Sequence, residues 1–356
     1  MGELTTHERV KRMYEHREAD RVPITDSPWG ATIERWHREG MPEEADFAEF
    51  FGLDRFAYIG VDNSPRYPGR VVEETEEYII TTSPWGVTMK NWKHRGGVPE
   101  FLDFTIVDRD SWQEAKARMT PTPDRIPWDT LRQNYRRWRE EGYWISAGLW
   151  FGFDVTHSWV VGTERVLMAM VEDPEWLVDM FHHFLDVNLA LLDMIWEAGY
   201  TFDEVTWPDD MGYKGHQFFS LKTYRDLLKP AHKRACEWAQ AHGVYVRLHS
   251  CGDVRPFISE FIEIGVQMLN PIEVKAGMEP TALKRQYGDR LGFHGGLNAV
   301  LFYDMDAMFA EMERVIPVMK QGGGYIISSD HSVPDSVSLD QFRAFVQKAK
   351  ALGRYD

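Results

Sequence analysis

The stretch "VYVRLHSCGD", residues 244–253, joins a short apolar strand to a polar turn. Its first three residues are β-branched or aromatic, which is typical of a strand, and the Gly-Asp pair at its end is typical of a turn. His249 and Cys251 lie between the two, and Cys251 is one of only two cysteines in 356 residues. In a (β/α) barrel the chemistry lies at the C-terminal ends of the strands. The stretch therefore indicates both a fold class and the position of a site.

The same strand-and-turn pattern recurs along the chain. From about residue 124, strand-like segments alternate with longer amphipathic helices through short connections, which predicts parallel strands with helical crossovers. The strand-like segments are "RVPI", "FAYIGVD", "WISAG", "EVTWP", "VYVRLHS", "QMLNP", "LGFHG" and "YIISS". This count of roughly eight is the number that closes a barrel. We therefore predict an α/β fold, a single (β/α)8 TIM barrel domain over residues 1–356. An open doubly wound sheet is the alternative, but no Gly-x-Gly-x-x-Gly follows an early strand.

The N-terminal third departs from this pattern. Thr5 and Glu8 have capping-box spacing at the start of a predicted helix. Residues 34–123 are irregular and rich in Trp, Gly and Pro, and "YIITTSPWGVTMKNW" within them predicts a β-hairpin around a Pro-Trp-Gly turn. We expect an irregular N-terminal hairpin insertion in the barrel.

Composition excludes several classes of protein. The net charge of −16 argues against nucleic-acid binding and against docking on anionic membranes, which need basic surfaces. No stretch approaches ~18 consecutive apolar residues, and the charged N-terminus has no apolar core of a signal peptide. Two cysteines are too few for a disulfide framework, so we expect a cytoplasmic protein.

The ends of the predicted strands are polar, and in a barrel they would converge on one mouth. The side chains that they offer are Asp62, Asp209, Asp210, His249, Cys251, Glu273, His294, Asn298, Asp330 and His331.

Cys251 has three interpretations. It could be a small apolar filler, a nucleophile with His249 or His294 as its base, or a metal ligand beside an imidazole. His-x-Cys at a strand end lets both side chains point the same way, because alternate residues share a face. Zn²⁺ takes such N and S ligands, and a reactive zinc site keeps one position open. A third ligand is then needed, for which we predict His331, with Glu273 or Asp330 as alternatives.

The other polar and aromatic residues also allow two interpretations each. His331 could instead order its own loop by hydrogen bonding. Asp209 and Asp210 could be a catalytic base pair or cation site, or could cap the following helix. His294 could polarise a substrate or be a hydrogen-bonded barrel histidine. Aromatic side chains could line a substrate pocket or be core, and the candidates are Trp29, Trp144, Trp150 and Trp207.

The chain resembles the uroporphyrinogen decarboxylase superfamily over nearly its whole length. The resemblance lies in "THERVKRMYEHREADRVPI", in "HSCGDV" followed by "FISEFIEIGVQMLNPIEVKAGMEPTALKRQYGDRLGFHGGLNA", and in "GGGYIISSDHSVPDSVS". It implies a (β/α)8 barrel. One branch of the superfamily decarboxylates porphyrinogens through an arginine-bearing motif, and here "RVPITDSPWGATIERW" lacks that cluster. Asp62 in "YIGVD" looks like the decarboxylases' key aspartate.

The other branch consists of corrinoid-dependent methyltransferases that bind zinc through His-x-Cys and a distant cysteine. His249 and Cys251 match the first half of that motif, and His331 falls where the distant cysteine is expected. The resemblance implies a zinc-dependent methyltransferase acting between a methylated small molecule, such as a methoxyarene, or a thiol and a corrinoid (cobalamin).

The corrinoid would belong to a partner protein, because the chain has no Asp-x-His-x-x-Gly motif. O-demethylase activity is one form of this reaction, and a homodimer is plausible. The catalytic candidates are Asp62, Asp209, Asp210 and His294, and the substrate-binding candidates are Trp29, Trp150, Trp207 and Asn298. The alternatives are a decarboxylase of a tetrapyrrole or another carboxylate, and a non-catalytic barrel binding protein.

Overall fold

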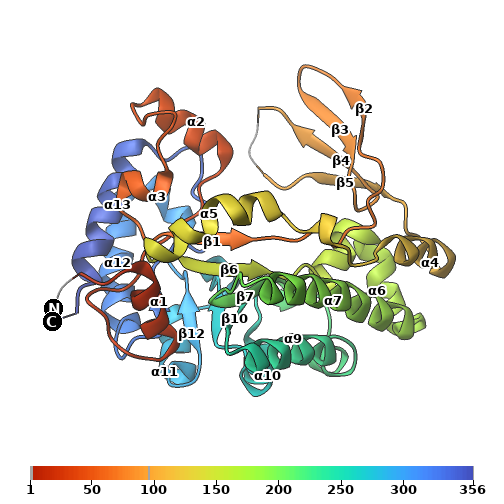
Figure 1. The fold of residues 1–356 in the computed structure, drawn as a ribbon. Coiled ribbons are helices and arrows are strands. Elements are labelled where there is room, and N and C mark those ends of the chain that lie inside the picture. The colour runs from red at the N-terminus through yellow and green to blue at the C-terminus, as the bar shows by residue number, and fades with distance from the viewer. Residues whose placement is uncertain (1–2, 95–96, 356) are drawn as a thin grey trace.

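The computed structural model describes residues 3–94 and 97–355, and its centre is a curled parallel sheet of seven strands. The strands lie in the spatial order β1-β6-β7-β10-β11-β12-β13, and each neighbouring pair is parallel. Their bounds are β1 (Phe56–Ile59), β6 (Trp144–Gly148), β7 (Glu204–Pro208), β10 (Tyr245–His249), β11 (Met268–Asn270), β12 (Gly292–His294) and β13 (Tyr325–Ile326). The predicted α/β class and parallel topology are confirmed (Figure 1).

The eighth predicted strand, "RVPI", is not a regular strand. Ile24 makes a single parallel bridge with Ile327, and its carbonyl accepts a hydrogen bond from the Asp54 amide at 2.9 Å. The Pro23 carbonyl accepts a hydrogen bond from the Ile327 amide at 2.9 Å, but proline has no N–H group that could donate a second bond to the neighbouring strand. The segment therefore lies between β13 and the start of β1 with only isolated backbone contacts.

Helices surround this sheet on its outer side (Figure 1). Their bounds are α1 (Thr6–Tyr14), α2 (Gly30–Arg38), α3 (Phe47–Phe51), α4 (Arg109–Arg118), α5 (Trp128–Glu140), α6 (Thr163–Glu172), α7 (Pro174–Glu197), α8 (Leu221–Thr223), α9 (Lys229–His242), α10 (Ile258–Ile264), α11 (Pro280–Tyr287), α12 (Met305–Met319) and α13 (Leu339–Leu352). The helix predicted over residues 221–241 is interrupted by a π-helical turn, Tyr224–Leu228, immediately before α9. Pro230 explains the interruption, because it removes one helical hydrogen bond and crowds the preceding turn. No described helix is long and apolar enough to cross a membrane.

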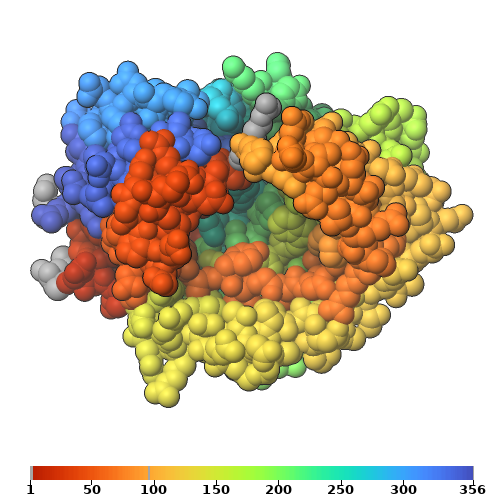
Figure 2. Space-filling model, turned by 90° about the horizontal axis from the view of Figure 1, so that it is seen from above, coloured from red at the N-terminus to blue at the C-terminus, as the bar shows by residue number. Residues whose placement is uncertain are grey.

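The predicted N-terminal insertion is an antiparallel sheet of four strands. Its strands are β2 (Arg70–Glu74), β3 (Tyr78–Thr82), β4 (Val87–Trp92) and β5 (Glu100–Phe104). β3 and β4 form the expected hairpin, with Thr82 paired to Thr88 beside the Pro-Trp-Gly turn. Figure 2 looks into a hollow between this orange sheet and the red-orange N-terminal segment.

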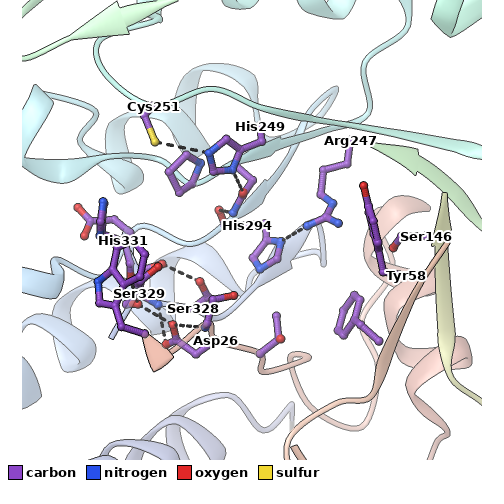
Figure 3. Close-up of a pocket in the computed structure, with 18 of the residues that line it drawn as sticks. Asp26, Tyr58, Ser146, Arg247, His249, Cys251, His294, Ser328, Ser329 and His331 are labelled. Atoms are coloured by element: carbon purple, nitrogen blue, oxygen red, sulfur yellow. Dashed lines mark hydrogen bonds between the residues drawn. The ribbon is translucent and has the colours of Figure 1, made fainter. Parts of the chain in front are cut away.

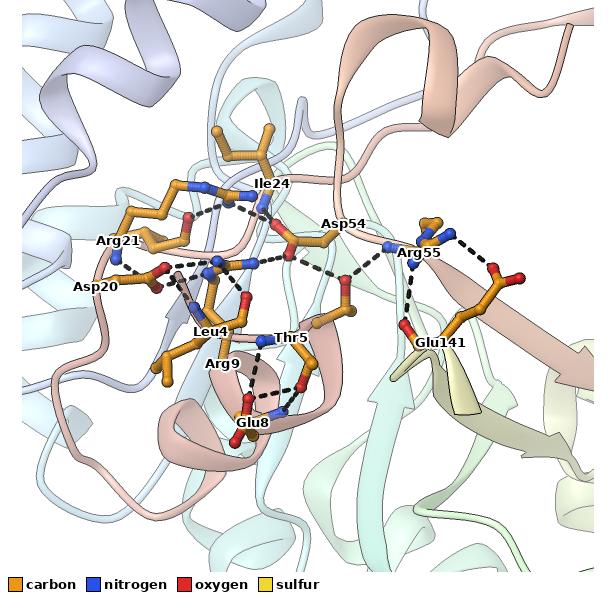
Figure 4. A network of polar contacts seen from close by, with 12 residues as sticks. Leu4, Thr5, Glu8, Arg9, Asp20, Arg21, Ile24, Asp54, Arg55 and Glu141 are labelled. Carbon is orange, nitrogen blue, oxygen red and sulfur yellow. Dashed lines mark hydrogen bonds and ion pairs between the residues drawn. The ribbon is translucent and has the colours of Figure 1, made fainter. Parts of the chain in front are cut away.

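A buried ion network attaches the N-terminal helix to the sheet (Figure 4). Thr5 and Glu8 form the predicted capping box at the start of α1. Arg9 of α1, with 3% of its side chain exposed, pairs with Asp20 at 2.6 Å and with the fully buried Asp54 at 2.5 Å. Asp54 immediately precedes the segment that leads into β1, so this arginine links α1 to the beginning of the sheet.

We predict that Arg9→Ala lowers the free energy of unfolding by about 3 kcal/mol, because it leaves buried carboxylates without their main partner. Urea denaturation at neutral pH measures the change. Arg12→Ala is the matched control on the same helix, since the Arg12 side chain donates to the Glu18 carbonyl at an exposed position. Equal stability of the two variants would contradict this role of Arg9.

Candidate metal centre and cavity

A cavity of about 490 Å³ opens at the C-terminal ends of the parallel strands. Its lining comprises Thr25, Asp26, Ser27, Trp29, Phe56, Ala57, Tyr58, Ser146, Asp210, Arg247, His249, Cys251, Asn270, Pro271, His294, Ser328, Ser329, Asp330, His331 and Ser332. These residues come from both ends of the chain and from all seven strands or the loops that follow them. The location is the one that a TIM-like sheet uses for chemistry.

Three potential metal ligands meet on one wall of the cavity. The ligand atoms of Asp210, His249 and Cys251 all lie within 4.8 Å of one another. His249 Nε2 is 3.5 Å from Cys251 Sγ and 3.7 Å from Asp210 Oδ1. Two ligands ~2.1 and ~2.3 Å from a tetrahedral zinc lie ~3.6 Å apart, so these separations suit a shared cation.

Neighbouring side chains orient the histidine of this group. His249 Nδ1 lies 2.6 Å from Asn270 Oδ1, and the Asn270 amide nitrogen donates to the His294 carbonyl at 3.1 Å. That second bond fixes the amide, so its oxygen faces the imidazole and accepts from Nδ1–H. The lone pair of Nε2 is then left for a ligand, which is the arrangement that outer hydrogen bonds give metal-bound histidines.

The loops that carry the ligands are held together by their backbones. Gly252 has φ +81°, and a Cβ built there would lie 2.0 Å from the Gly212 carbonyl carbon. Only glycine permits both the conformation and this approach. The Cys251 amide also donates to Asp210 Oδ1 at 2.7 Å. The loop after β7 and the loop after β10 are therefore in direct contact, through their glycine backbones and through the hydrogen bond between Cys251 and Asp210.

The electrostatics of the group favour a bound cation. Burial raises the pKa of the Cys251 thiol well above its ordinary value, and the nearby carboxylates of Asp210 and Glu273 raise it further. Burial also raises the pKa of Asp210. A divalent cation reverses both effects, because it stabilises thiolate and carboxylate together. The donor set of one nitrogen, one sulfur and one oxygen therefore fits zinc.

Asp209 and Asp210, adjacent in sequence, point in opposite directions. Asp210 faces the cavity, whereas Asp209 is completely buried and lies 2.7 Å from His232 Nε2, itself fully buried. The Asp209 carbonyl accepts from Ser250 Oγ at 2.6 Å. Successive residues of an extended segment point to opposite faces, so only one of the pair can reach the cavity. Asp209 supports the loop after β7 from the core and does not line the cavity.

The predicted ligand His331 lines the cavity but does not belong to the three-ligand group. Trp29 and His331 line the cavity together, with ring centroids 5.9 Å apart, and His331 lies outside the three-ligand group. The role of His331 as a ligand stays a prediction. Of its two alternatives, Asp330 accepts from the Val274 and Ala299 amides, both at 2.8 Å, and Glu273 accepts from the Gly252 amide at 2.6 Å.

Four further candidates do not line this cavity. Asp62 pairs with Arg66 at 2.6 Å, and Asn298 caps a 3-10 turn, Ala299–Tyr303. Trp207 is fully buried core, and Trp150 packs against Trp159 at 5.9 Å between ring centroids. Of the two interpretations of these tryptophans, packing in the hydrophobic core therefore applies to Trp207, and Trp29 lines the cavity.

The floor of the cavity holds residues that sequence reasoning did not assign. Arg247 of β10 pairs with the buried Glu204 of β7 at 2.7 Å, and its Nη1 lies 3.2 Å from His294 Nδ1 (Figure 3). Burial, with the Arg247 guanidinium, holds the pKa of His294 well below its usual range. Since the guanidinium donates to Nδ1, the neutral His294 ring carries its proton on Nε2. The alternation of polar residues along β10, Arg247 and His249, was the available signal.

A TIM-like α/β protein with a polar, metal-suited cavity at the ends of its strands is the class that this fold and site define. Residues 155–352 match the family "Uroporphyrinogen decarboxylase (URO-D)", and the chain belongs to that family. A comparison with curated proteins gives no match.

Two solved structures are similar to this chain, and the first of them shows the likeness of the fold. A methyltransferase from Methanosarcina mazei is 16% identical, with a TM-score of 0.64 over 98% of this chain and 99% of that chain. A putative vitamin-B12 independent methionine synthase from Listeria monocytogenes is 10% identical, with a TM-score of 0.41 over 94% of this chain and 98% of that chain.

We predict that Asn270→Ala weakens zinc binding by ~10- to 100-fold, because the imidazole of His249 loses its orienting acceptor. Competition with a coloured chelator measures the dissociation constant. Asn298→Ala is the control, since Asn298 caps a 3-10 turn and is not part of the cavity lining. Unchanged zinc affinity in Asn270→Ala would show that the amide does not tune this histidine.

Proposed function

We propose that this chain is a zinc-dependent methyltransferase that moves a methyl group between a small methylated molecule or a thiol and a corrinoid carried by a partner protein. The observation that carries the proposal is the group of Asp210, His249 and Cys251 on the wall of one cavity. Membership of the URO-D family and the fold shared with a methyltransferase support it.

His249, Cys251 and Asp210 are the proposed protein ligands, and His331 is a candidate for an additional ligand from another part of the cavity lining. Zinc held there would supply Lewis acidity toward an oxygen or sulfur of the substrate. Asp210, His249 and Cys251 alone would leave a fourth position for that atom, as in other reactive zinc sites, whereas His331 as an additional ligand would occupy it.

The remaining polar groups of the cavity would position the substrate. His294 carries its proton on Nε2 and can donate a hydrogen bond while remaining neutral, because Arg247 occupies Nδ1. In the demethylating direction the partner's corrinoid would supply the nucleophile, and the methyl group would leave the substrate without the electron pair of its bond to oxygen. The oxygen keeps that pair and takes up a proton, so charge and atoms balance.

The two alternatives make different demands on the cavity. A polycarboxylate decarboxylase needs several free cationic side chains, and among the described residues the cavity lining contains one arginine and no lysine. A non-catalytic binding protein predicts scattered ligands, whereas three of them converge. The methyltransferase therefore agrees best with the residues present.

We predict roughly one zinc per chain in the native protein and its loss in Cys251→Ala, because the thiolate is a ligand. Elemental analysis after dialysis measures the metal. Cys236→Ala is a matched control, since Cys236 is the other cysteine and is buried in α9. A native chain without metal after zinc has been supplied would refute the proposed mechanism.

We also predict that the zinc-loaded protein methylates free cob(I)alamin from a methoxyarene, and that Asp210→Asn lowers the rate by ~100-fold or more. The absorbance of methylcobalamin reports the reaction. Asp226→Asn is the control, since Asp226 forms an exposed ion pair with Lys222. A rate in Asp210→Asn equal to that of the control would exclude Asp210 from the reaction.

A further inference from the structure

The single guanidinium on the described cavity lining is already paired with a buried carboxylate. Arg247 Nε and Nη2 contact Glu204 Oε1 at 3.0 and 2.7 Å, and Nη1 contacts His294 Nδ1 at 3.2 Å. Glu204, with 1% of its side chain exposed, balances the positive charge of Arg247 from a buried position. The positive charge of Arg247 at the floor of the cavity is therefore balanced by the negative charge of Glu204.

Other contacts strengthen this compensation. Ser146 Oγ donates to Glu204 at 2.6 Å, and the Tyr14 hydroxyl donates to the same carboxylate. These two donors hold the carboxylate of Glu204 in place beside Arg247. Glu204 therefore stays available as the counterion of Arg247, and a second carboxylate at this arginine would face the first.

The cavity also presents acidic groups away from its floor. Asp26 and Asp330 both line it, and Asp26 accepts from Ser329 Oγ at 2.7 Å and from the Ser329 amide at 3.1 Å. Burial raises the pKa of Asp26 to about 6, and the charge of Asp330 adds to this. The two positive charges of a divalent cation bound by Asp210, His249 and Cys251 would be balanced by the Cys251 thiolate and the Asp210 carboxylate. The occupied group would then carry no net positive charge.

Aromatic faces supply the rest of the binding surface. Phe56, Tyr58 and Trp29 line the cavity (Tyr58 is labelled in Figure 3). A Cβ built on Gly148 would lie 1.7 Å from the Tyr58 hydroxyl, so the glycine at the end of β6 makes room for this ring. The cavity volume of about 490 Å³ accommodates a molecule of one aromatic ring with small substituents.

We propose that the cavity selects uncharged one-ring methoxyarenes and discriminates against those that carry a carboxylate. This inference rests on the proposed function, whose small methylated substrate it specifies. Discrimination arises because an anionic substrate would meet Asp26, Asp330 and the counterion of Arg247, without a free cation to offset its loss of hydration.

Calorimetric titration of the zinc-loaded protein with 2-methoxyphenol and 2-methoxybenzoate at pH 7.5 tests the proposal. We expect the phenol to bind at least ~10-fold more tightly, a difference that a single unfavourable charge contact can produce. Equal or tighter binding of the benzoate, or binding of neither, would overturn the proposal. Metal content and methyl transfer are measured in separate experiments. A failure of the proposed selectivity can therefore be told apart from a failure of the proposed reaction.

Glu204→Gln provides a second test, because it removes the counterion and leaves the shape of the site. We expect the preference for the phenol to fall by ~10-fold or to reverse, since Arg247 becomes free to bind a carboxylate. Glu260→Gln is the matched control, since Glu260 is a buried glutamate paired with Arg225 on the outer helices. An unchanged preference in folded Glu204→Gln would overturn the role of this pair, and the wild-type titration decides the proposal if that variant does not fold.

Discussion

The register of three parallel strands is the constraint on which the candidate metal centre depends. His249, the last residue of β10, pairs with Pro208 on β7 and with Asn270 on β11. The three strands therefore end level with one another, and the group that orients His249 lies directly beside it. A slip of one residue would turn every side chain of β10 to the other face and would take His249 out of the cavity.

The same register explains how far the site could be predicted from the sequence. The alternation of Arg247, His249 and Cys251 was visible in the sequence, and so was the run of polar residues at strand ends. Asp209 and Asp210 were equally good candidates, because sequence does not tell which of two adjacent residues faces the core after a strand has ended. The structure decides it through His232, which lies on a helix and holds Asp209 inward.

The fold was more predictable than the site for a related physical reason. Hydrophobic periodicity and turn residues act locally, so the presence of most helices and strands between residues 163 and 294 could be predicted without knowledge of distant contacts. Which of these elements lie next to one another could not be predicted in this way. The exceptions are set by prolines: Pro23 prevents a regular first strand, and Pro230 interrupts the helix before α9. Asn270 was missed as a partner of His249 because its role comes from pairing between strands 21 residues apart in sequence.

The wall of the cavity, with Asp210 and Cys251, and its floor, with Arg247 and Glu204, differ in charge. We relate this difference to two proposed roles, metal binding on the wall and substrate orientation on the floor. On the wall, no contact with a lysine or arginine is recorded for the Asp210 carboxyl group or the Cys251 thiol among the described residues, which is a condition that favours a metal. On the floor, Arg247 and Glu204 compensate each other inside the sheet, so they order His294 without contributing net charge. In the proposed reaction, a cation on the wall would act on a substrate whose orientation is set by neutral hydrogen bonds and aromatic faces from the floor. Because the two sets of residues share β10, where Arg247 and His249 point to the same face, the distance between metal and substrate contacts is fixed by the strand itself.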